Sequence, residues 1–393
     1  MRYDFDRVPS REGVYAIKHG NAEKMGHAPD ELPMWVADMD FPSPPSVAEA
    51  ICDYARRGFF GYSEAMDDYY DAATGWFARR HGVEYGRDWL VTTPGVVFAI
   101  NNAVLAYTEP GDAVLIQTPV YYPFATVVSR NGRKLVTNEL VYTPGGKPEY
   151  TIDLEDFERK IADNGVKLFV LCSPHNPVGR VWTRDEHAAM GEICLRHGVI
   201  VVSDEIHCDL IMPGHKHIPF LAACPDAAGS AVVCTAPSKT FSLAGLQTSN
   251  IWIPDERMRR RFRSQLACAA AGSANILGLI ACKAAYETGE EWLDQVIAYI
   301  QGNVDLARGF LASELPQLHM VELQGTYLVW MDFSALGMET QELNDFIQHE
   351  AKLWLDAGSM FGGQGDQFQR LNFACSRSTV EEALARLKSA INK

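Results

Sequence analysis

The sequence lacks the features that mark membrane-spanning, secreted and disulfide-stabilised proteins. No uninterrupted apolar run reaches about 18 residues, so a transmembrane helix is excluded. The opening segment MRYDFDRVPSREG has no apolar core, and we expect no secretory signal. The nine cysteines are an odd number without a C-x-x-C pair, and several lie in apolar runs. We therefore expect free thiols and a cytoplasmic protein.

Positive charge is scarce as well. Lys and Arg total 35 against 50 Asp and Glu, the net charge is −15, and no long Lys/Arg run occurs. We therefore expect neither nucleic acid nor an anionic membrane surface as a partner. Apolar residues make up 47% of the 393 residues, which is ordinary for a folded protein. At about 100–200 residues per domain, this length predicts two or three folding units.

Several catalytic motifs are also missing. Neither G-x-G-x-x-G nor G-x-x-x-x-G-K-[ST] occurs, so NAD and P-loop nucleotide binding lose most of their support. Without G-x-S-x-G, a Ser/His/Asp hydrolase is unsupported. His207, Cys208, His215 and His217 lie within eleven residues, but no H-E-x-x-H or paired C-x-x-C accompanies them, so we expect no metal site.

From about residue 85, short apolar runs alternate with helical patterns. We expect strands at 89–93, 113–118, 134–140, 167–173, 199–205, 231–236 and 249–254. Helical patterns between them include 96–108, 152–164 and 183–198. The last of these begins with a capping signal, Thr183 followed by Glu186. Strands that are apolar throughout indicate a parallel sheet buried on both faces, and the alternation indicates a doubly wound α/β layer.

The two ends of the chain follow other patterns. Residues 255–313 are mostly helical, and the remainder, with helices expected at 339–351 and 378–391, predicts a smaller α+β domain. The first 45 residues fit neither pattern and predict an extended arm. We therefore expect three parts: an arm at 1–45 that joins the small domain, a large domain at 46–288 and a small domain at 289–393.

Two residues suited to chemistry stand at the ends of apolar strands. Asp204 lies in VVSDEIH and Lys239 in TAPSKTF. In an open α/β sheet, ligands bind beyond the carboxyl ends of the strands. A lysine there suits Schiff-base chemistry, and an aspartate suits a cationic partner. Either residue taken alone favours a strand-end salt bridge, because structural ion pairs also occupy such places.

Three other segments follow predicted strands. SPHNPVGR (173–180) forms a rigid turn that presents Asn176. Gly95 opens a helix in TTPGVVFAINNA, and free N–H groups at a helix start bind phosphate. TPVYYPF (118–124) places two tyrosines past a strand. Each segment also has a purely structural explanation. These are an ordinary βα connection for SPHNPVGR, a single turn glycine for Gly95 and core aromatics for the two tyrosines.

Arg370 is embedded in an apolar segment, between Phe368 and Phe373. A buried arginine needs an anionic partner, and an internal salt bridge and a ligand carboxylate are equally compatible with this pattern. One ligand would use all of these groups at once: a flat, phosphorylated, cationic ring that forms an imine. Pyridoxal phosphate (PLP) fits, because it needs a lysine and an acid partner for its ring nitrogen.

The order of these motifs resembles the fold-type I PLP enzymes of the class I/II aminotransferase group over nearly the whole chain. The strings MWVADMDF (34–41), FGYSE (60–64), SPHNPVGRVW, SDEIH and Trp292-Leu293 are similar to the cystathionine β-lyase (C–S lyase) branch of that group, typified by MalY and PatB. The resemblance implies an α/β protein of PLP-dependent transferase fold type I. It would have a large domain with a mostly parallel seven-stranded sheet and a smaller α+β domain.

The same resemblance implies roles around the cofactor ring. Lys239 would form the Schiff base and move the Cα proton, and Asp204 would keep the pyridine nitrogen protonated. Asn176 would hydrogen-bond the ring O3′, Tyr121 would stack on the ring, and His207 would line the cofactor site.

Other roles implied by the resemblance concern the phosphate and the substrate. The N–H groups of Val96 and Val97 after Gly95, together with Ser238, would hold the phosphate. Tyr62 would reach the phosphate of a neighbouring subunit, so the active unit would be a homodimer. The substrate would be bound by Arg370, which would clamp its α-carboxylate, with Ala37 and Asn176.

Three positions depart from the usual aminotransferase pattern. His207 stands where a tyrosine is usual, Gln247 replaces a phosphate-binding arginine, and Ala236 replaces a frequent serine. The Gln247 change removes a cation from the phosphate site and argues against a standard transaminase. The His207 change recurs in the lyase branch.

We therefore expect a PLP-dependent carbon–sulfur lyase that releases pyruvate, ammonia and a thiol from L-cystathionine or L-cysteine-type substrates. An aminotransferase using the same cofactor is the alternative, since both reactions begin with loss of the Cα proton. A PLP-sensing regulator is a remote alternative. It would need a DNA-binding module before the PLP-type region and a basic surface, and neither is apparent.

Overall fold

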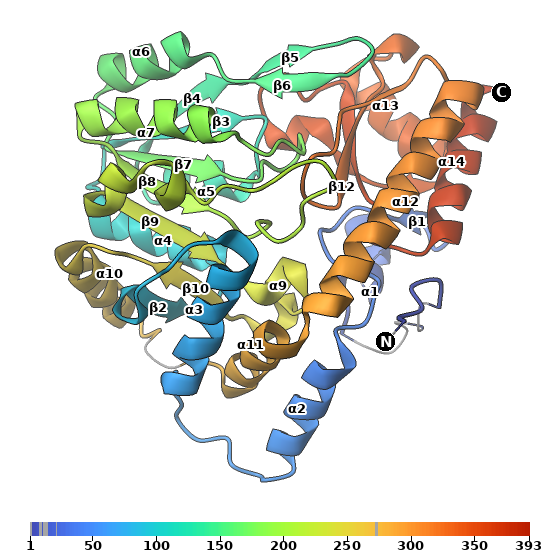
Figure 1. Cartoon of the computed structure of the whole chain (residues 1–393). Coiled ribbons are helices and arrows are strands. Elements are labelled where there is room, and N and C mark those ends of the chain that lie inside the picture. Colours follow the sequence, from blue (N-terminus) through green and yellow to red (C-terminus); the bar gives the residue numbers. More distant parts are fainter. Residues whose placement is uncertain (1, 8–9, 11–14, 21, 272–273) are drawn as a thin grey trace.

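A central sheet of seven strands organises the larger part of the molecule (Figure 1). The computed structural model describes residues 2–7, 10, 15–20, 22–271 and 274–393. In spatial order the strands are β2 (Leu90–Thr93), β10 (Ser249–Trp252), β9 (Ala231–Thr235), β8 (Ile200–Asp204), β7 (Leu168–Cys172), β3 (Ala113–Thr118) and β4 (Lys134–Glu139). All seven strands expected from the sequence form, and all belong to this one sheet.

The sheet is mostly parallel, as predicted. The pairs β9–β8, β8–β7, β7–β3 and β3–β4 are parallel, whereas β10 runs antiparallel to both of its neighbours. Successive side chains enter different cores: Val114 and Ile116 belong to one buried cluster, and Leu115 belongs to the other. Burial on both faces explains why these strands are apolar throughout.

Helices cover both faces of this sheet (Figure 1). One face packs against α4 (Val96–Tyr107), α5 (Pro123–Arg130) and α10 (Glu256–Cys268). The other face packs against α6 (Leu154–Asn164), α7 (Arg184–His197), α3 (Asp67–His81) and α11 (Ile276–Thr288). Helix α7 begins with the predicted capping box, in which Thr183 and Glu186 bond reciprocally to each other's backbone N–H.

A second, antiparallel sheet lies in the C-terminal part of the chain. Its strands, in order, are β11 (His319–Met320), β12 (Leu328–Asp332), β15 (Phe368–Asn372) and β14 (Asp356–Ala357). It packs with α12 (Glu290–Glu314) and α14 (Arg377–Ile391), which confirms an α+β unit. The helix expected over 339–351 forms, and its second half is π-helical: α13 (Thr340–Asp345) continues directly as the π-helix Phe346–Glu350.

The N-terminal segment is only partly the extended arm that we expected. It contains two short helical turns, α1 (Ile17–Gly20) and Glu23–Met25, and residues 1, 8–9, 11–14 and 21 lie outside the described part. Strand β1 (Leu32–Pro33) pairs with β13 (Leu353–Trp354) beside the small sheet. Helix α2 (Pro45–Ala55) and the hairpin β5 (Val141–Thr143) and β6 (Glu149–Thr151) complete the fold.

Among the described residues, no helix is both long enough and apolar enough to cross a membrane. The three-part division at residues 45 and 288 remains a prediction. The two sheets are separate hydrogen-bonded units, but one large apolar cluster includes residues from both, such as Leu115 and Leu328.

Candidate active site

The carboxyl ends of three neighbouring strands converge on one cavity of about 210 Å³. Asp204 is the last residue of β8, and Asn176 follows β7 by four residues. Lys239 lies in the short helix α9 (Pro237–Thr240), which begins just after β9. All three residues line the cavity. Because β7, β8 and β9 are adjacent and parallel, residues far apart in the sequence meet at one edge of the sheet.

Lys239 is half-buried, and its amine reaches the N-terminal segment. Its Nζ donates a hydrogen bond of 2.7 Å to the backbone oxygen of Ala37, which also lines the cavity. Burial lowers the pKa of Lys239 to about 8, although Asp38 and Asp204 act in the opposite direction. The ion pairs among the described residues do not include one between Lys239 and Asp204. The strand-end salt bridge is therefore not the arrangement found, and the amine is close to the range in which it can accept a proton.

Asp204 and His207 are both buried. Burial raises the pKa of Asp204 to about 7, while a hydrogen bond from the Ile206 N–H at 3.1 Å partly opposes this shift. Burial also places the pKa of His207 well below its ordinary value, with Lys239 and Arg370 adding to the effect. His207 is therefore neutral near pH 7, and its ring lies edge-on to Tyr327. A cation placed beside Asp204 would favour the ionised carboxylate.

One end of the cavity is built for an anion. Gly95 has φ +137°, a left-handed value, and precedes α4, whose first residues Val96 and Val97 line the cavity with Ser238. A Cβ added at Gly95 would meet no atom within 4 Å, so the space in front of this residue is open. The first N–H groups of a helix have no intrahelical partners. An anion in this part of the cavity could therefore accept hydrogen bonds from these N–H groups, and the phosphate site remains a prediction.

At the other end, Tyr121 and Asn176 lie between the two sheets. The Tyr121 N–H donates to the Asn176 backbone oxygen at 3.1 Å, and the Asn176 Oδ1 accepts from Arg370 Nη1 at 3.1 Å. Burial raises the pKa of Tyr121 to about 12, so its phenol stays neutral. Asn176 thus connects the cavity wall to Arg370 on the small sheet.

Arg370 has the internal acid that the sequence left open as an alternative. It forms a buried ion pair with Asp356, its antiparallel neighbour on β14. Nη2 also donates to the Trp35 backbone oxygen at 2.9 Å, and the guanidinium lies 4.9 Å above the ring of Phe361. Arg370 therefore reaches the cavity through Asn176 while one of its nitrogens is already engaged by a carboxylate.

Three positions singled out from the sequence lie elsewhere. Tyr62 is fully exposed in the segment between α2 and α3. Gln247 lies in a separate hollow of about 580 Å³, which adjoins the cavity because Pro94 lines both. Ala236 is buried as the N-cap residue of α9. Within this chain, then, neither Tyr62 nor Gln247 lines the cavity.

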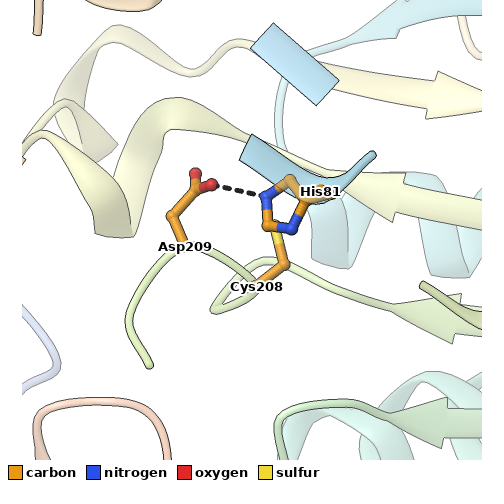
Figure 2. Close-up of side chains that lie close together, drawn as sticks. All are labelled: His81, Cys208 and Asp209. Carbon is orange, nitrogen blue, oxygen red and sulfur yellow. Dashed lines mark hydrogen bonds and ion pairs between the residues drawn. The ribbon is translucent and has the colours of Figure 1, made fainter. Parts of the chain in front are cut away.

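A second polar cluster lies beneath α9 and is shown in Figure 2. His81 Nε2 is 2.7 Å from Asp209 Oδ1, with Cys208 beside them, and Asp209 also accepts hydrogen bonds from Trp76 and Thr240. Two ligands of one zinc ion would lie roughly 3.3 Å apart, so this spacing fits a direct hydrogen bond better. Although burial raises the pKa of Asp209, these donors lower it overall. Asp209 thus anchors the residue that follows Lys239.

The four residues weighed as metal ligands in the sequence do not form one ligand set among the described residues, although Cys208 and His217 both lie against His81. His207 lines the cavity, whereas His217 Nε2 donates to the Glu205 carboxylate at 3.0 Å in a fully buried pair. His215 is exposed, and Cys208 belongs to the cluster with His81.

Sequence reasoning missed three residues at the site. Asp356 holds Arg370, Trp35 supplies a backbone oxygen to it, and Tyr327 donates to the same Ala37 oxygen as Lys239, at 3.0 Å. Asp356 carried a signal, because a lone acid within the apolar segment LWLDAG requires a buried partner. Trp35 acts through its backbone, and no residue type predicts such a contact.

Comparisons with known proteins agree with this geometry. The family model for aminotransferase class I and II matches residues 30–387. The chain is 43% identical to cystathionine beta-lyase PatB of Bacillus subtilis (strain 168) over 99% of its length and 100% of that protein. It is 32% identical to Protein MalY of Escherichia coli (strain K12), with 99% of both chains covered.

Among solved structures, cystalysin from Treponema denticola, which contains a pyridoxal 5′-phosphate cofactor, superposes with a TM-score of 0.95. The two are 37% identical, over 100% of this chain and 99% of that one. The predicted fold type and the predicted resemblance are therefore confirmed. By the family match over most of its length and by its identity to these relatives, the chain belongs to the aminotransferase class I and II family.

Proposed function

We propose that this protein is a PLP-dependent carbon–sulfur lyase that converts L-cystathionine or L-cysteine-type substrates into pyruvate, ammonia and a thiol. The observation that carries the proposal is the full-length identity of 43% to a protein named as a cystathionine beta-lyase. The arrangement of Lys239, Asp204 and Asn176 around one cavity supports it, since a PLP enzyme needs a lysine and an acid in such a place.

The residues of the cavity fit this cofactor. Gly95, Val96, Val97 and Ser238 would hold the phosphate. Burial raises the pKa of Asp204, which disfavours its anion in the empty cavity. A protonated ring nitrogen beside it would stabilise this anion. The Asn176 Oδ1 already accepts from Arg370, which leaves its NH₂ group as the donor toward the ring oxygen. Tyr121, neutral and partly buried, would stack on the ring, and His207 would border it without charge.

When bound, pyridoxal phosphate supplies an aldehyde that captures amines and a ring that withdraws electrons from the substrate Cα. The chain itself would supply the proton transfers. Lys239 Nζ would take the Cα proton as a general base, because burial has brought its pKa to about 8. Arg370 would bind the substrate α-carboxylate and orient the Cα–H bond toward Lys239. Ala37, whose oxygen accepts from Lys239, would border the substrate.

We further propose that the active unit is a homodimer with shared sites. The segment that carries Tyr62 exposes Phe59, Phe60 and Met66 as well. A contiguous exposed apolar segment of this kind favours an interface with another protein surface. The hollow beside the phosphate end would receive this segment from a second copy, and Tyr62 would then reach the phosphate. A cytoplasmic location is also proposed, since all nine cysteines are free thiols among the described residues.

The decisive experiment is pyruvate release from L-cystathionine with no 2-oxo acid added, accompanied by homocysteine. A panel with L-cysteine, L-cystine and S-alkyl cysteines would identify the favoured leaving group. The matched control is Lys239→Ala, which should release nothing. If amino acids were consumed only when a 2-oxo acid is supplied, the protein would be an aminotransferase and the lyase proposal would be wrong.

A further inference from the structure

The guanidinium of Arg370, the proposed partner of the substrate carboxylate, already donates hydrogen bonds to groups of the protein. Its side chain is 2% exposed and that of Asp356 is 7% exposed, so their ion pair is shielded from water. Nη1 donates to Asn176 and Nη2 to Trp35 and Asp356, whereas Nε has no partner within the described part of the chain. Two of its five N–H groups, the one on Nε and one on Nη1, therefore remain open, although Asp356 already faces the positive charge.

Asp356 is placed to act on Arg370 throughout the catalytic cycle. The two residues are direct partners across the antiparallel strands β14 and β15, so the backbone holds them together. The pKa of Asp356 is raised overall, because the effect of burial exceeds the opposing effect of Arg370. A second carboxylate arriving at the same guanidinium would share one positive charge with Asp356, and two anions a few ångström apart repel each other.

We propose that Asp356 is a positioning residue that sets the affinity of the site for amino-acid carboxylates by half-neutralising Arg370 before the substrate arrives. Amino acids would consequently bind weakly and exchange rapidly. Their carboxylate would gain less binding free energy at Arg370 than it would if Arg370 had no ion pair with Asp356. This inference rests on the proposed role of Arg370 in binding the substrate α-carboxylate.

The test uses the cofactor-loaded protein and two probes that have no leaving group, L-alanine and L-alaninamide. Their dissociation constants are measured from the change in the absorption band of the bound cofactor. Asp356→Asn keeps an oxygen for Nη2 but removes the negative charge. We expect L-alanine to bind about tenfold more tightly, because one charge a few ångström away at an effective dielectric constant of about 20 has at least this effect. L-alaninamide, which has no carboxylate, should change less than about twofold.

The control is Asp332→Asn, which removes another buried acid of the same sheet. Asp332 accepts a hydrogen bond from Tyr142 at 2.9 Å and forms no ion pair with Arg370 among the described residues. It should leave the ratio of the two dissociation constants unchanged. If Asp356→Asn yields too little folded protein, Asp356→Ser offers the same test. The rise in unfolding temperature caused by L-alanine should also be larger in either Asp356 variant than in the unaltered protein.

The outcomes separate this inference from the proposed function. An unchanged ratio of L-alanine to L-alaninamide affinity, or weaker L-alanine binding in a folded Asp356→Asn variant, would overturn the role of Asp356. Pyruvate release from L-cystathionine tests the lyase activity independently. If no pyruvate is released but Asp356→Asn shows the expected shift in L-alanine affinity, the role of Asp356 stands. Only the proposed lyase reaction is then refuted.

Discussion

Replacing Arg370 by methionine would separate the two interactions of this guanidinium, with the buried Asp356 and with the substrate carboxylate. Methionine keeps the apolar stem of the side chain but removes the guanidinium, which leaves Asp356 as a buried carboxylate without a cation. Removing one member of a buried ion pair costs about 3–5 kcal/mol in the free energy of unfolding. We expect Arg370→Met to lose stability by that amount and to release pyruvate from L-cystathionine at a strongly reduced rate.

The double variant Arg370→Met with Asp356→Asn should recover most of the stability, because no unpaired charge is left inside. We expect it to lie within about 1–2 kcal/mol of the unaltered protein. It should not recover activity, because the substrate carboxylate still has no arginine. Urea unfolding followed by tryptophan fluorescence measures the first quantity. At a slope of about 3 kcal/mol per molar urea, the single variant should unfold about 1–1.7 M earlier.

Two results would refute this reasoning. If Arg370→Met unfolds at the same urea concentration as the unaltered protein, the ion pair with Asp356 contributes nothing to the fold. If the double variant regains pyruvate release, Arg370 does not bind the substrate and another group receives the carboxylate.

Three further predictions concern the cofactor. Lys239→Ala should lose the borohydride-reducible adduct with the cofactor; an adduct that persists on the protein would contradict the assignment. Asp204→Asn should retain some cofactor but lose turnover by orders of magnitude, and a near-normal rate would contradict its role at the ring. Mixing the Lys239→Ala and Tyr62→Ala variants should restore part of the activity through mixed dimers, since one site would then hold both residues. No gain on mixing would exclude a shared site.

A pH dependence follows from Asp204 in the cofactor-free protein. Its folded-state pKa, about 7, lies above the ordinary value of 3.8, so the folded protein holds the proton more tightly than the unfolded chain. The contribution of this group to stability therefore falls as the pH rises from about 4 to 7 and is constant above that range. Thermal unfolding of cofactor-free protein between pH 5 and 8 should show this slope, and Asp204→Asn should remove it. Equal slopes in the two proteins would contradict the raised pKa.

Local sequence patterns determined most of the central sheet. Runs such as LFVLC are apolar at every position because both of their faces are buried, and this property can be read without knowing the neighbours. The capping box at Thr183 and Glu186 involves residues three apart and was equally predictable. The sheet topology brings three site residues together. Asp204 ends β8, whereas Lys239 and Asn176 come after the neighbouring strands β9 and β7.

Contacts between distant segments were decided only by the tertiary structure. Whether Arg370 pairs with an internal acid depended on the register of β14 against β15, which brings Asp356 opposite it. Lys239 donates a hydrogen bond to the backbone oxygen of Ala37, which lies 202 positions earlier in the chain. Because this acceptor is a backbone atom, no residue type could have revealed the contact. Asp209 became an anchor for α9 because α3 brings His81 and Trp76 to it. A sequence specifies which groups need partners, but the choice among several possible partners depends on distances that exist only once the segments have packed.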